Sequence, residues 1–167
     1  MNIVYLSKNM GGYQSASYQQ DVMDEFSRQA HVFFYGPGFS GYDIEDSIDD
    51  VLAKTASDPD VIILGHAWLS DIDGGTVDPH PRLNLSQTNI LKVVILNKEY
   101  TNLDPKLDYI KHSRFDLGFT HHHDVERYSE STGTEFTFWP FAYNLCFHKG
   151  SYKNVFFDCK ILEPGEI

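Results

Sequence analysis

Three consecutive histidines followed by an aspartate, His121 to Asp124, form the densest group of potential metal ligands and bases in the sequence. In an extended segment His121 and His123 face the same way. Asp124, Asp78 or His80 could then complete a metal site. However, the sequence lacks an HExxH pair, and any other ligand would have to come from a distant loop. We therefore expect no dedicated metal site, and interpret the histidines as polar contacts to a substrate or as solvated loop residues.

Two more side chains are candidates for general bases because each follows an aliphatic run. His66 comes directly after residues 60–65, and Glu99 comes shortly after residues 92–96. A side chain at the end of a buried strand can be held in place to take a proton from a substrate. With His121 these are the three catalytic candidates, although capping or loop hydrogen bonds remain an alternative role for His66 and Glu99. The sequence has neither a GxSxG elbow nor a Walker-type loop, which disfavours a serine hydrolase and a P-loop NTPase.

The beginning of the chain combines a short apolar run, residues 3–6, with Gly11-Gly12 and the start of a helix. Ser17 and Gln20 have the spacing of a capping box for that helix. A strand, a glycine turn and a helix N-terminus in this order leave backbone N–H groups where an anion could bind. The alternative is that the glycine pair only makes a tight turn between strand and helix.

Apolar runs alternate with helical patterns along the rest of the chain. The sequence predicts further strands at residues 31–35, 60–65, 92–96, 115–120 and 134–138. It predicts helices that begin at Asp43, at Asp104-Pro105 and at Asp124, the last one ending near Gly133. The apolar stripe of the first of these helices starts at Ile44, and its acidic side chains at 45, 46, 49 and 50 are interpreted as a solvated face.

This alternation predicts an α/β domain, a Rossmann-like three-layer fold around a mostly parallel sheet of about six to seven strands. In such sheets ligands bind outside the carboxyl ends of the strands. That edge would gather residues 36–38 and the three base candidates. It would also gather the candidates for substrate binding, which are Gly11, Gly12, Asn97, Lys98, His122 and His123. The long polar segment 70–86 is predicted to be a binding loop or lid, or to be disordered.

Composition excludes several classes of function. The 167 residues carry a formal net charge of −11, which opposes nonspecific binding to nucleic acid or to an anionic membrane. No stretch approaches the roughly 18 apolar residues of a membrane-spanning helix, and the start does not have the pattern of a secretory signal. Cys146 and Cys159 form no CxxC pair, so we interpret them as reduced thiols of a cytoplasmic protein.

Four stretches of the chain carry a resemblance to a known family. They are the opening with Gly11-Gly12, the segments 97–100 and 115–121, and Trp139-Pro140-Phe141-Ala142. Together they resemble the N-terminal Rossmann-like domain of GT-B glycosyltransferases, especially the group related to spore-maturation glycosyltransferases. In that group a strand near the end of this half leads into a "PFA" segment, after which the chain crosses to a second domain.

The resemblance implies that a sugar is transferred from a nucleotide-sugar to an acceptor hydroxyl. The nucleotide-sugar is then a substrate, and no further cofactor is implied. Gly11 and Gly12 look like the loop that approaches the donor diphosphate or the acceptor. His66, Glu99 and residues 121–123 look like acceptor-side residues, and the motif does not decide which of them is the base.

The resemblance also divides the chain. Residues 1–145 look like the Rossmann-like half, and residues 146–167 look like the crossover to a second domain, with residues 155–157 resembling its first strand. In the family the second domain supplies most of the sugar-nucleotide pocket. We therefore expect this chain to be a fragment, or to work with a separate C-terminal domain or by self-association. By itself it should have weak or no transferase activity.

Two other functions remain as alternatives. The first is a noncatalytic α/β ligand-binding or regulatory module. A receiver-type domain is disfavoured, because the first strand leads into Ser7-Lys8 without paired acids and the third ends in Gly65-His66 instead of an aspartate. The second alternative is a metal-dependent hydrolase that uses His66 and residues 121–123.

Overall fold

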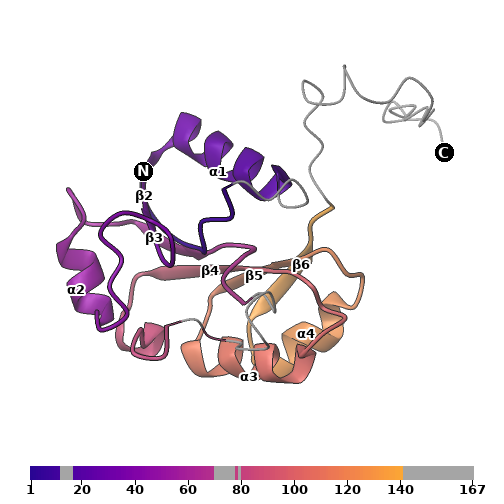
Figure 1. Ribbon diagram of the computed structural model, residues 1–167. Coiled ribbons are helices and arrows are strands. Elements are labelled where there is room, and N and C mark those ends of the chain that lie inside the picture. Colours follow the sequence, from indigo (N-terminus) through magenta and orange to yellow (C-terminus); the bar gives the residue numbers. More distant parts are fainter. Residues whose placement is uncertain (12–16, 70–77, 79, 141–167) are drawn as a thin grey trace, which may run out of the picture.

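The computed structural model describes residues 1–11, 17–69, 78 and 80–140. Within this part of the chain, six parallel strands form one sheet in the order β2-β1-β3-β4-β5-β6 (Figure 1). The strands are β1 (Asn2–Leu6), β2 (His31–Tyr35), β3 (Val61–Leu64), β4 (Leu91–Leu96), β5 (Leu117–Thr120) and β6 (Glu135–Phe138). The predicted α/β class and parallel sheet are therefore confirmed.

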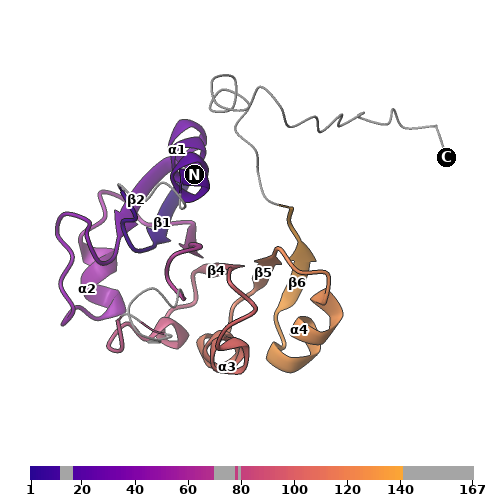
Figure 2. The ribbon, with the colours of Figure 1, turned by 45° about the vertical axis from the view of Figure 1, so that its right-hand side comes forward.

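Helices cover both faces of this sheet, which gives the predicted three layers. The helices are α1 (Ser17–Gln29), α2 (Ile48–Ala53), α3 (Leu103–Ser113) and α4 (Val125–Thr132). Helix α1 lies on one face, and α2, α3 and α4 lie on the other (Figures 1 and 2). The strand order reverses direction between β1 and β3, because β2 lies outside β1 and all later strands follow β3 on the opposite side.

Two apolar clusters form the core, one on each face of the sheet. Ile3 and Tyr5 of β1 pack with Met23 of α1, whereas Val4 and Leu6 contribute to the larger cluster beneath the other three helices. This alternation follows from the two-residue period of a strand. All four residues of β3 are buried, as expected for a central strand of a parallel sheet.

The second helix begins later than predicted. Asp43 does not cap it, because the Asp43 carboxylate accepts the N–H of Glu45 in a local turn. Helix α2 begins at Ile48 instead, where Ser47 and Asp50 each accept a backbone N–H from the other in a capping box. Ile44 consequently lies outside the helix and is exposed.

One of the acidic residues assigned to a solvated face is in fact part of a polar network. The Asp46 carboxylate accepts hydrogen bonds from Lys54 and from the hydroxyl of Tyr35. Both bonds lower the pKa of this carboxyl, and the bond from Lys54 has the larger effect. The backbone carbonyl of Asp46 contacts Nε2 of His80 at 2.8 Å, and Nδ1 of His80 lies 3.2 Å from the hydroxyl of Tyr42. His80 is therefore fully buried in this network, and neither contact involves the histidines at 121–123.

The remaining boundaries differ little from the predictions. Helix α3 has Asn102 at its N-cap, so that Pro105 is its third residue, where the missing N–H costs nothing because the first turn has no intrahelical acceptor for it. Helix α4 ends at the predicted Gly133, whose φ of +76° suits glycine. The predictions for Gly12, the cysteines and residues 155–157 concern positions outside the described residues, as does the prediction for most of the polar segment 70–86.

Candidate functional site

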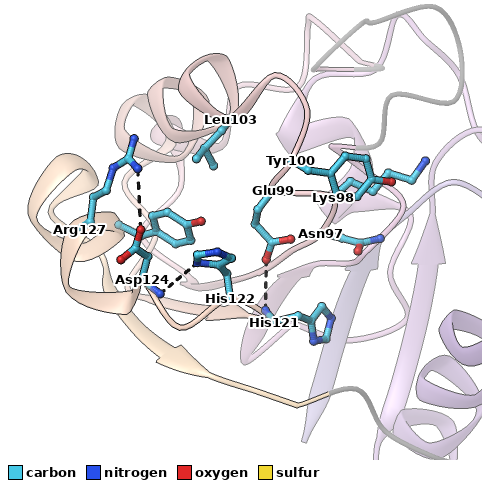
Figure 3. Close-up of a pocket in the computed structure, with 10 residues that line it drawn as sticks. Asn97, Lys98, Glu99, Tyr100, Leu103, His121, His122, Asp124 and Arg127 are labelled. Carbon is cyan, nitrogen blue, oxygen red and sulfur yellow. Dashed lines mark hydrogen bonds and ion pairs between the residues drawn. The ribbon is translucent and has the colours of Figure 1, made fainter.

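A pocket of about 350 Å³ opens at the carboxyl ends of β4 and β5. Its walls come from the β4–α3 connection, the start of α3, the β5–α4 connection and the first turn of α4 (Figure 3). The lining residues are Asn97, Lys98, Glu99, Tyr100, Leu103, His121, His122, Asp124, Arg127 and Tyr128. The pocket therefore brings together five of the predicted site residues from two separate parts of the sequence.

Glu99 is the carboxylate that the fold holds most firmly in this pocket. Its Oε1 accepts the hydroxyl of Thr120 at 2.6 Å and the backbone N–H of His121 at 3.2 Å. Both donors belong to the end of β5, so the neighbouring strand fixes the side chain. Oε2 accepts no hydrogen bond from the residues that the structure describes. One oxygen is thus anchored while the other can accept a proton from a bound hydroxyl.

The loop that carries Glu99 is fixed by hydrogen bonds from a buried lysine. Lys106 of α3 is fully buried, and its Nζ donates to the backbone carbonyls of Lys98 at 3.0 Å and Asn97 at 3.4 Å. Lys98 has a φ of +53°, which turns the chain sharply after β4. Asn97 is tied to α1 by a hydrogen bond from its Nδ2 to the hydroxyl of Tyr18, 2.9 Å long. The Lys98 side chain extends past Tyr100, away from Arg127 (Figure 3).

His121 and His122 have different environments although they are adjacent. Nδ1 of His121 lies 2.6 Å from the carbonyl of Trp139, which can only accept, so Nδ1 carries the hydrogen. Nδ1 of His122 instead accepts the backbone N–H of Asp124, so a neutral His122 carries its hydrogen on Nε2 and can donate with it. The ring of His121 points away from His122 (Figure 3).

His66 lies beside the pocket rather than in its wall. Its ring stacks on that of His121, with centroids 5.3 Å apart and planes at 11°, and the edge of Tyr18 meets it at 5.4 Å. Burial, with a smaller effect of His121, lowers the pKa of His66 to about 3. No hydrogen bond reaches its Nδ1 from the described residues. A neutral, buried imidazole without access to the pocket is poorly placed to act as the base.

His123 and Gly11 do not line this pocket. His123 stacks on Phe138 with ring centroids 4.4 Å apart. The N–H of Gly11 donates to Oδ1 of Asn9, whose Nδ2 donates to the carbonyl of Gly38. The segment of Asn9 and Gly11 follows β1, near the reversal of the strand order between β1 and β3, where ligands of open α/β sheets commonly bind. The pocket lies instead at β4 and β5.

Sequence reasoning missed Tyr128, Arg127, Leu103 and Tyr100 as pocket residues and Thr120 and Lys106 as their supports. The sequence pattern places Tyr128 only within the helix that begins at Asp124. The signal that could have found it is its place in the first turns of a helix that starts at the carboxyl edge of the sheet, four residues after Asp124.

Comparison of the chain with protein-family models, with curated protein sequences and with solved structures finds no significant match in any of the three. Among the described residues, no three His, Cys, Asp or Glu side chains are grouped so that they could hold a metal ion. None of the helices in the described ranges is both long enough and apolar enough to cross a bilayer.

The burial of His66 predicts a pH dependence of stability. In the unfolded chain a histidine takes up a proton near pH 6.5, whereas the folded state resists protonation of His66 down to about pH 3. Between these values the unfolded state binds more protons, so the free energy of unfolding should fall as the pH falls, by up to about 1.4 kcal/mol per pH unit.

Urea unfolding of the wild type and of His66→Phe between pH 8 and pH 4 checks this expectation. At pH 8 the difference in the free energy of unfolding between the two proteins reports only the change in packing. Below pH 6.5 the wild type should lose stability more steeply than the variant. Parallel curves for the two proteins would contradict a neutral, buried His66.

Proposed function

We propose that this chain is a cytoplasmic GT-B-type glycosyltransferase half that holds the acceptor, and that it takes part in sugar transfer from a nucleotide-sugar to an acceptor hydroxyl. The observation that carries the proposal is the anchored carboxylate of Glu99 at the carboxyl edge of a parallel sheet. The resemblance of segments 97–100 and 115–121 to the N-terminal domain of these enzymes supports it. Glu99 and His121 come from these segments.

In the proposed reaction the acceptor hydroxyl donates to Oε2 of Glu99, which takes the proton as the hydroxyl oxygen bonds to the anomeric carbon of the sugar. The bond from that carbon to the diphosphate breaks at the same centre, and the diphosphate leaves with the electron pair. Nε2–H of His122 is a donor for another oxygen of the acceptor. Lys98 and Arg127 are the cationic side chains of the pocket wall, suited to the charge that develops on the leaving group.

The proposal includes a partner for the donor side. The described residues offer the anionic diphosphate only these two pocket cations, one of them paired at 3.8 Å with Asp124. A separate C-terminal GT-B domain, or a second copy of this chain, would complete the donor site. The nucleotide-sugar is a substrate, and the proposed chemistry uses no metal and no cofactor.

A binding screen tests the proposal. The thermal unfolding midpoint of the purified chain is followed with a panel of nucleotide-sugars, free nucleotides and methyl glycosides, and the metal content of the same sample is measured. A ligand present at 100 times its Kd should stabilise the native state by about 2.7 kcal/mol and raise the midpoint accordingly. We expect a saturable rise with at least one glycoside or nucleotide-sugar.

Three other results would count against the proposal. No rise with any of these compounds would contradict it. Binding that never leads to release of nucleoside diphosphate, even with a completed donor site, would favour the noncatalytic module. One bound metal ion per chain would favour the metal-dependent hydrolase.

A further inference from the structure

Tyr128 lies in the wall of the pocket with its ring held rigidly. It is the fourth residue of α4 and is only 1% exposed. Its ring and that of Phe136 are arranged edge to face with centroids 5.7 Å apart, and the ring centroid of His122 lies 6.0 Å away. Packing of this kind fixes both side-chain torsions, so the direction of the hydroxyl is set before any ligand binds.

The Tyr128 hydroxyl has no hydrogen-bond partner among the described residues. No hydrogen bond joins it to any residue that the structure describes, although Glu99, Asp124 and Arg127 are close enough for their charges to act on it. Although the residue as a whole is buried, its hydroxyl is not among the fully enclosed polar atoms that lack a partner, so this oxygen is accessible to a ligand in the pocket that Tyr128 lines. Burial, together with the charges of Glu99 and Asp124, raises the pKa of the phenol, which keeps it a donor at neutral pH.

The pocket therefore presents an acceptor and a donor to the same ligand. Oε2 of Glu99 can accept a hydrogen bond from a ligand, and the hydroxyl of Tyr128 can donate one. The two groups are close enough for the charge of Glu99 to act on the Tyr128 phenol. Two adjacent oxygens of one molecule, one donating its hydrogen and the other accepting, could satisfy both groups. Neighbouring hydroxyls on a sugar ring have this chemistry.

We propose that Tyr128 contacts the ligand and selects vicinal diols. Its hydroxyl donates a hydrogen bond to the oxygen of one sugar hydroxyl, and Glu99 binds the neighbouring hydroxyl. This inference rests on the proposed function of the same pocket. It goes further by naming the ligand chemistry that the pocket recognises and the residue that recognises it.

The test combines one variant with one missing hydroxyl. The affinities of the wild type and of Tyr128→Phe are measured by NMR titration for methyl α-D-glucopyranoside, galactopyranoside and mannopyranoside and for their monodeoxy analogues. For the best ligand we expect Tyr128→Phe to bind about 3- to 10-fold more weakly, the usual effect of losing one neutral hydrogen bond. Removing the matching hydroxyl from the glycoside should weaken wild-type binding equally and leave the variant almost unaffected.

Two controls separate recognition from structure. Without ligand, Tyr128→Phe should unfold at the wild-type midpoint, because the hydroxyl contributes no bond to the fold. A fall of more than roughly 3 °C would instead indicate a structural role and overturn the inference. Tyr109→Phe on the neighbouring helix is the matched variant, since that partly buried tyrosine does not line the pocket. It should leave glycoside affinity unchanged.

The outcomes also separate this inference from the proposed function. If glycosides bind the wild type and Tyr128→Phe equally well, the proposed role of Tyr128 is refuted while the proposed function stands. If no glycoside and no nucleotide-sugar binds the wild type, both are wrong.

Discussion

Glu99→Gln should lower the rate of sugar transfer by about 10²- to 10⁴-fold, the usual contribution of a general base. The amide oxygen of glutamine can still accept the hydroxyl of Thr120 and the N–H of His121, which now fix Oε1. The amide nitrogen then takes the place of Oε2 and presents hydrogens where a proton acceptor is needed. The fold should be preserved while the chemistry is lost.

Release of nucleoside diphosphate in the presence of the best acceptor, with the donor site completed, measures this effect. Glu126→Gln is the control, because it makes the same change of charge on the exposed first turn of α4 without lining the pocket. We expect its rate to stay within a few-fold of the wild type. If Glu99→Gln and Glu126→Gln have equal rates, Glu99 is not the base, and His122 becomes the next residue to test.

Gly36→Ala should destabilise the chain by roughly 3 to 5 kcal/mol, the sum of a backbone clash and of strain in the left-handed region. Gly36 has a φ of +142°, and a Cβ added there would lie 2.0 Å from the backbone carbonyl oxygen of Ser7. The same atom would lie 3.0 Å from the ring of Trp68. Because the obstructing oxygen is backbone, no side chain can move aside to relieve the contact.

Equilibrium unfolding in urea measures this loss, and Gly41→Ala is its matched control. Gly41 also has a positive φ, +81°, but an added Cβ would meet nothing within 4 Å. It should cost only the backbone strain, roughly 1 to 2 kcal/mol. Similar losses at the two positions would contradict the close approach of Gly36 to Ser7. That approach joins the connections after β1 and β2 at the carboxyl edge of the sheet.

The fold class was predictable from the sequence because it depends on local patterns. The aliphatic run before Gly65 is typical of a strand buried on both faces, and regular strands and helices satisfy most backbone groups by a repeating hydrogen-bond pattern. Helix ends were less predictable where two capping patterns compete. Asp43 and Ser47 are both suitable caps, and the reciprocal pair of Ser47 with Asp50 decided the start of α2.

The sequence by itself determined which segments form the sheet and that Asn97, Glu99 and His121 share its carboxyl edge, since strand direction and chain order are enough for that. Only the tertiary structure decided which side chains face the pocket. The carbonyl of Trp139 holds the ring of His121 away from His122, and the positive φ of Lys98 with the buried ammonium of Lys106 sets the direction of Glu99. These contacts join residues from different strands and helices, so no local pattern encodes them.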